Sequence, residues 1–182
     1  MSMIWWKNVS SLSKRLMMTA FVLVTLVVIL SIGTLMPISQ SEAQATDKQL
    51  TDQVNYLGDN GLLVPYIFGN NLMITLIMFI PFVGPIFGAY VIFNTGTIIA
   101  ARSVAEGIPP LFWVGALLVN PIFWLEFAAY SLAVSASIWL TLRIFQHRTL
   151  HELSNTTKFV TISAVLLLAG AIVETAEIML MR

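Results

Sequence analysis

The sequence predicts an all-α protein: a polytopic transmembrane helical bundle of about five spans, with one hairpin broken by proline and glycine. Hydrophobic residues make up 58% of the 182 positions and charged residues only 10%, whereas a soluble domain is roughly 25% charged. The apolar residues gather in four blocks separated by polar segments. The chain has no cysteine and a formal net charge of zero, which excludes disulfides and thiolate sites and argues against a nucleic-acid partner.

The N-terminal part predicts a membrane anchor. Residues 1–15 are expected to form an interfacial segment, because Trp5 and Trp6 lie beside a lysine, a combination that suits lipid headgroups. A short disordered tail is the alternative. Residues 16–36 are uncharged and form the first transmembrane anchor, because 21 helical residues cross a hydrocarbon core of about 30 Å. A cleaved signal peptide ending near residues 43–45 is the alternative, but its apolar region would usually have roughly 7–15 residues. An uncleaved anchor is therefore favoured.

Residues 37–66 are the main polar stretch and predict an extracytoplasmic loop with one surface helix. Pro37 is expected to end the first span and Ser41 to cap the surface helix, which closes near Gly58. The segment holds four acidic side chains and one lysine.

Residues 67–182 are expected to form the transmembrane core, and its first apolar block, 67–101, is interrupted. A proline within a helix removes a hydrogen bond and clashes with the preceding turn. Two interpretations remain open: one kinked helix, or two helices that meet at a turn. The candidate turn residues are Pro81, Gly84, Pro85 and Gly88.

The charges of the loops set the expected topology. Lysine and arginine favour the cytoplasmic side, which places the N-terminus and the basic segment 143–158 inside and the acidic segment 37–66 outside. The chain must then cross the membrane an odd number of times between the acidic segment 37–66 and the basic segment 143–158. Block 111–142 supplies one crossing, so block 67–101 should supply two. With a last span at 159–180, we expect a multi-pass protein of the cell membrane with a cytoplasmic N-terminus.

Several polar residues fall within the apolar blocks, and Glu126 is the most notable. A carboxylate at the centre of a membrane helix costs roughly 2.5–3.5 kcal/mol. Glu126 either packs against a neighbour such as Asn94 or serves proton or ion transport. The pair Asn120-Pro121 predicts an ordinary kink or a broken helix of the kind that forms transporter sites. The candidate embedded residues are Asn71, Asn94, Asn120, Pro121, Glu126, Glu174 and Glu177.

Glu174 and Glu177 share one face of the last helix because they lie three residues apart. Arg102 is expected on the same side of the membrane, so a latch between Arg102 and one of these acids is one hypothesis. The alternative is that Glu177 reaches water.

Features of chemistry and association are few. His147 and His151 have helical spacing for a metal but lack further ligands, so no metal or cofactor is expected. No phosphate-binding, nucleophile-elbow or zinc-protease motif is present, so we expect no enzyme. Small residues at 129, 133 and 137 predict close helix packing, within the chain or in a homo-oligomer.

The chain resembles the SpoIIM-like family, named for stage II sporulation protein M, over roughly residues 68–177. The residues that carry the resemblance are Phe68, Asn70, Asn71, Leu72, Gly84, Gly88, Asn94, Thr95, Gly96, Pro121, Glu126 and Glu174. The family pattern around the glutamate usually reads Pro-His-Gly-x-x-Glu. Here Ile122 and Phe123 replace the histidine and glycine, so any role of that histidine does not carry over.

The resemblance implies a multi-span membrane protein that gathers envelope proteins, as the namesake does with cell-wall hydrolases; a role in sporulation is not carried over. The first hypothesis is therefore a non-catalytic scaffold or assembly component for other membrane or envelope proteins. The alternative is a small permease or channel-like transporter that uses Glu126 and the broken helix at Asn120-Pro121. The expected partners are the lipid bilayer, such proteins and a second copy of the chain.

Overall fold

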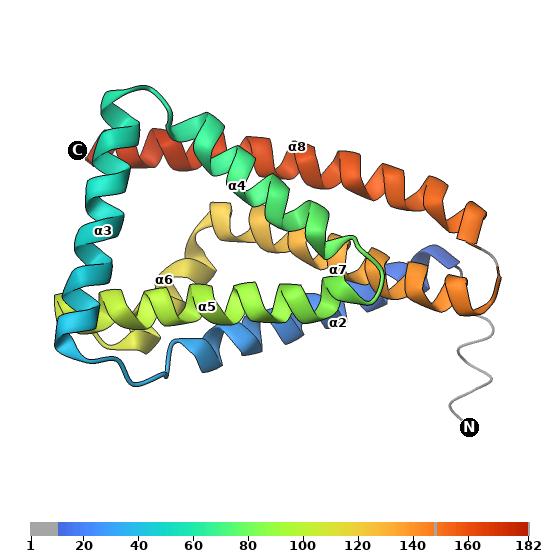
Figure 1. Cartoon of the computed structure of the whole chain (residues 1–182), viewed down its shortest axis with the longest axis horizontal. Helices are drawn as coiled ribbons and strands as arrows, with labels where there is room; N and C mark the ends of the chain where they lie inside the picture. The colour runs from blue at the N-terminus through green and yellow to red at the C-terminus, as the bar shows by residue number, and fades with distance from the viewer. Residues whose placement is uncertain (1–10, 148, 182) are drawn as a thin grey trace.

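The computed structural model describes residues 11–147 and 149–181; in this part of the chain seven helices are joined by short connections, and there are no strands (Figure 1). The all-helical fold class is therefore confirmed. The helices are α2 (Ser11–Gly33), α3 (Gln40–Asp59), α4 (Leu63–Met78), α5 (Val83–Glu106), α6 (Pro110–Val119), α7 (Pro121–Phe145) and α8 (Thr149–Met181).

Four helices are long and apolar enough to cross a membrane: α2, α5, α7 and α8. They lie along a common direction and pack on one another, α7 against α8 and α2 against α5 and α7 (Figure 1). Helices α4 and α6 are apolar but shorter, with 16 and 10 residues. The described chain is thus a helical bundle of membrane character.

The bundle has two distinct ends (Figure 1). Helix α3 crosses one end, which we call the α3 end. The start of α2, the turn between α4 and α5, and the connection between α7 and α8 lie toward the other, which we call the Arg15 end. An ion pair between Arg15 of α2 and Glu152 of α8 fixes two of these segments together.

The first two helices begin earlier than the sequence indicated. Helix α2 ends at Gly33, before the predicted end of the span at residue 36. The N-cap of α3 is Ser39, so the expectation of Ser41 is wrong. The Ser39 hydroxyl accepts from the Glu42 amide at 3.3 Å, and the Glu42 carboxylate accepts from the Ser39 amide at 3.2 Å. Hydrogen bonds from Ser39 also lower the pKa of the Glu42 carboxyl. The N-terminal tryptophans lie outside the described residues.

Block 67–101 forms two helices, so the hairpin interpretation is confirmed. The turn spans residues 79–82, and Phe82 adopts a φ of 63°, which is costly for a residue with a Cβ. Tertiary bonds hold this turn: the Phe82 amide donates to the Thr141 hydroxyl at 3.0 Å, and the Ser137 hydroxyl donates to the Ile80 carbonyl at 2.7 Å.

Of the four candidate turn residues, only Pro81 lies in the turn. Gly84, Pro85 and Gly88 belong to α5, which corrects the sequence-based assignment. Pro85 is tolerated because the first turn of a helix does not use its backbone amides. A Cβ on Gly84 would overlap the carbonyl of Met78, so this glycine permits the tight reversal instead of forming it.

The third block is broken rather than kinked. Helix α6 ends at Val119, Asn120 is extended with a ψ of 124°, and α7 starts at Pro121. The predicted basic loop 143–158 is largely wrong, since α7 continues to Phe145 and α8 begins at Thr149. Polar residues there suggested a loop, but two of them, Arg143 and Glu152, form an ion pair between α7 and α8.

The core lies around α7. Its small residues Ala129, Ala133 and Ser137 are fully buried, and Ser137 faces Gly84 of α5. The predicted small-residue stripe is thus a packing face within the chain.

Candidate functional site

Glu126 lies in the second turn of α7 and faces α4. The Asn71 side-chain amide donates a hydrogen bond to Glu126 Oε1 at 2.6 Å. The proposed partner Asn94 is wrong, because its amide bonds to the Tyr90 carbonyl of its own helix at 2.8 Å. The asparagine that satisfies Glu126 therefore comes from α4 and not from α5.

Helix α8 brings a second carboxyl group to the same place. Gly170 faces Glu126, since a Cβ at this glycine would lie 3.8 Å from Glu126 Cγ. Glu174 follows one helical turn later and lines the same cavity as Glu126. Within the described part of the chain, Glu126 has its bond to Asn71, whereas no hydrogen bond or ion pair is found for the Glu174 carboxyl.

Asn120 links the break between α6 and α7 to α8. Its side-chain oxygen accepts from the Ile122 amide at 2.8 Å and thereby caps α7. Its side-chain nitrogen donates to Glu177 Oε2 at 3.2 Å. Glu177 is thus held by the amide at the helix break, and the two members of the predicted acidic pair have different surroundings.

Arg102 does not form the expected latch with an acid of α8. Its Nε binds Glu106 Oε1 at 2.8 Å, and its guanidinium lies 5.1 Å from the ring centre of Trp113. Glu106 is four residues away on the same helix, so this pair needs no contact across the bundle.

A cavity of about 230 Å³ lies where these elements meet, and we call it the acidic cavity. Its polar lining residues are Thr95, Asn120, Glu126 and Glu174; apolar side chains from α2, α5, α6 and α7 form the rest. The volume is well above what one water molecule requires. Carboxyl, amide and hydroxyl oxygens here can accept a proton or bind a small cation or ammonium group.

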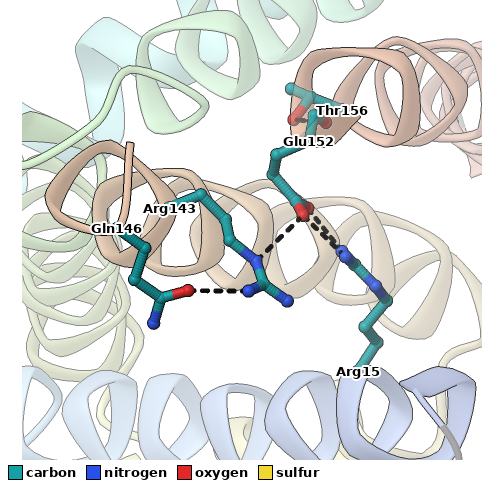
Figure 2. Close-up of polar contacts among 5 residues, drawn as sticks. All are labelled: Arg15, Arg143, Gln146, Glu152 and Thr156. Atoms are coloured by element: carbon teal, nitrogen blue, oxygen red, sulfur yellow. Dashed lines mark hydrogen bonds and ion pairs between the residues drawn. The ribbon is translucent and has the colours of Figure 1, made fainter. Parts of the chain in front are cut away.

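A second polar cluster, which we call the Arg15 cluster, lies at the Arg15 end and is drawn in Figure 2. Arg15 binds Glu152 with both terminal nitrogens, at 2.6 and 2.7 Å. Arg143 Nε lies 3.8 Å from the same carboxylate, and Arg143 also donates to Gln146 at 2.7 Å. The Glu152 side chain is only 2% exposed.

The same two arginines lie over one indole. Their guanidinium carbons are 5.3 Å (Arg15) and 5.8 Å (Arg143) from the ring centre of Trp139. The sequence-based interpretation missed this cluster, because it used the basic residues near the N-terminus and in segment 143–158 only as markers of the cytoplasmic side. The signal that could have indicated this cluster is one acidic residue, Glu152, within the otherwise basic segment 143–158.

Only one side chain of the histidine pair, that of His147, is described. His147 is exposed, and the side chain of His151 lies outside the described residues. Residues 11–147 and 149–181 hold no group of three metal-ligating side chains among those that were placed.

Comparisons with protein-family models, with curated proteins and with solved structures found no match for this chain. The SpoIIM-like resemblance therefore stays a prediction.

Proposed function

We propose that the chain crosses the cell membrane five times, through α2, α4, α5, α7 and α8, with a cytoplasmic N-terminus. The Arg15 end holds Arg15 and Arg143, whereas the α3 end holds the acidic surface helix, which agrees with the preference of basic residues for the cytoplasm. Helix α4 is the shortest span. Its 16 residues rise about 24 Å, and it runs obliquely from the α3 end toward the turn at 79–82 (Figure 1).

Cysteine labelling tests this topology, since the native chain has no cysteine. We expect Gln44→Cys on α3 to react with an impermeant maleimide from outside intact cells. Ile80→Cys and Ser154→Cys should react only after the cells are opened. All three side chains are exposed. Labelling of Ile80→Cys from outside would show that α4 does not cross.

We propose that the protein is a small permease or channel-like transporter and that the acidic cavity is its site. The observation that carries this proposal is that Glu126 and Glu174 line one cavity beside the break between α6 and α7. Ionisable groups within membrane helices are costly and usually mark ion or proton pathways. Broken helices next to such groups are a common way to form transport sites.

The hydrogen bonds of the two acids support transport over simple packing. A carboxyl that only packs helices together is normally hydrogen-bonded when buried. Glu126 has one amide partner, and no partner is found for Glu174 among the described residues. Both residues line a space that a solute or water can occupy.

Reconstituted protein provides the test. In liposomes that enclose a pH-sensitive dye, we expect the wild type to dissipate an imposed proton gradient faster than protein-free liposomes. Glu126→Gln removes the ionisable group but keeps the bond acceptor for Asn71, and should lower the rate at least about tenfold. Glu106→Gln, an acid outside the cavity, is the matched control and should keep the rate. An unchanged rate in Glu126→Gln would reject the proton-coupled form of the proposal.

A scaffold or assembly role is the second candidate, and the exposed polar face of α3 favours it. Helix α3 stands across one end of the bundle (Figure 1), and its side chains Glu42, Lys48 and Asp52 are exposed. Partner envelope proteins would bind this face. A co-purifying protein should be lost on the double change Lys48→Glu and Asp52→Lys. Repeated purification of the chain alone in mild detergent would argue against this role.

A further inference from the structure

A second cavity lies at the α3 end, and we call it the outer pocket. Its volume is about 330 Å³, and it lies between α3, the last turns of α5 and the last turns of α8. Its charged lining residues are Asp47 of α3 and Arg102 of α5. Leu50 and Val54 of α3 and Ile178 of α8 give it an apolar wall.

The two charges of the outer pocket are available to a ligand. Among the described residues, Asp47 and Arg102 form no ion pair with each other, although both line the pocket. Within residues 11–147 and 149–181, no hydrogen bond or ion pair is found for the Asp47 carboxylate. Arg102 uses Nε for Glu106 and lies over Trp113, while no hydrogen bond or ion pair of its two terminal nitrogens is found among the described residues. The outer pocket therefore has an anionic acceptor, Asp47, on its α3 side and a cationic donor, Arg102, on its α5 side.

We propose that the outer pocket binds a small zwitterion, specifically an α-amino acid with an aliphatic side chain. Its ammonium group would meet the Asp47 carboxylate and its carboxylate the Arg102 guanidinium, whose terminal nitrogens suit carboxylate geometry. The alkyl side chain would contact Leu50, Val54 and Ile178. A simple cation would be repelled by Arg102 and a simple anion by Asp47, so the pair selects for both charges in one molecule.

The outer pocket lies directly beyond the acidic cavity on the same helix faces. Thr95 and Ile99 of α5 line the acidic cavity, and Arg102 follows at helical spacing in the outer pocket. On α8, Glu174 lines the acidic cavity and Ile178, one turn later, lines the outer pocket. The outer pocket would thus be the entry site for an amine-bearing solute, with α3 across it. This entry role rests on the proposed permease function, whereas binding in the outer pocket does not.

Equilibrium binding of tritiated L-leucine to the purified full chain tests the proposal. We expect saturable binding, and Asp47→Asn and Arg102→Gln should each weaken it at least about tenfold, because each removes one charge-assisted contact. Glu106→Gln is the matched control: it removes the neighbour of Arg102 but leaves the outer pocket intact, and should keep affinity within about threefold. N-acetyl-L-leucine and L-leucinamide, which each lack one charge, should fail to compete.

The outcomes separate this proposal from the proposed function. The variant Glu126→Gln should bind leucine like the wild type but should lose the proton flux measured in liposomes. Leucine binding that depends on Asp47, without flux in any variant, would keep the outer pocket and reject the permease. No saturable binding by the wild type at up to about 10 mM, or equal binding by Asp47→Asn, overturns the inference. Asp47 lies on a surface helix, so this variant should fold even if Arg102→Gln does not, and its melting temperature checks that.

Discussion

Replacement of Arg15 by glutamine should lower the free energy of unfolding by about 3–5 kcal/mol, which is the usual cost of removing one partner from a buried ion pair. The reason for this cost is that the Glu152 carboxylate stays buried after its main partner is removed. Glu152 is 2% exposed and takes both of its short bonds from Arg15. Arg143 cannot replace them without rearrangement, because its Nε is 3.8 Å away and the guanidinium also binds Gln146.

Unfolding by denaturing detergent, followed by circular dichroism, measures this effect. The matched control is Glu106→Gln, which breaks an ion pair whose side chains are 53% and 31% exposed and should cost only about 0.2–1 kcal/mol. The double variant Arg15→Gln and Glu152→Gln should recover much of the loss, because no uncompensated charge stays buried. A loss below about 1 kcal/mol in the single variant would show that water reaches Glu152.

Gly96→Val should separate α2 from α5 and cost about 3 kcal/mol, the upper end of the usual range for overpacking. The two helices cross at Gly33 and Gly96. A Cβ on Gly96 would lie 2.8 Å from the Cα of Gly33 and would also overlap the carbonyl oxygen of Leu30. Because the neighbours are backbone atoms, no change of rotamer can relieve the clash.

The same unfolding assay, with Gly69→Ala as its control, tests the glycine contact. Gly69 lies in α4, and a Cβ added to it would enter open space. Alanine at this position should therefore leave stability unchanged or raise it by up to about 1 kcal/mol. Equal stability of Gly96→Val and the wild type would mean that α2 does not pack closely on α5.

The helical fold class and the number of apolar blocks were predictable, because both depend on composition and on run length. The division of block 67–101 into two helices near Pro81 was also predictable, because the expected loop charges favoured this interpretation over one kinked helix; that both helices cross the membrane stays a prediction. The break at Asn120 remained one of two alternatives in the sequence. Proline permits either a kink or a break, and the break places the Asn120 side chain where it caps α7 and reaches Glu177 on α8, a contact that no local pattern indicates.

The partners of the buried polar residues could not be predicted. In a block that is apolar on all sides, periodicity does not tell which face points inward. Asn94 and Asn71 were therefore equal candidates for Glu126, and the structure selects Asn71. The contact between Gly33 and Gly96 is hidden for the same reason. The Arg15 cluster joins residues 137 positions apart, a distance over which no local pattern extends.

The distance of 137 residues between Arg15 and Glu152 also determines when their ion pair can form during synthesis. Arg15 leaves the ribosome 137 residues before Glu152, which at about 5–20 residues per second is a delay of roughly 7–27 s. Trp139, the other contact of the Arg15 guanidinium, is also made late in the chain. The Arg15 guanidinium must therefore wait in water or among headgroups, and its ion pair with Glu152 is one of the last contacts to form, after α2 can already pack on α5 at Gly33 and Gly96.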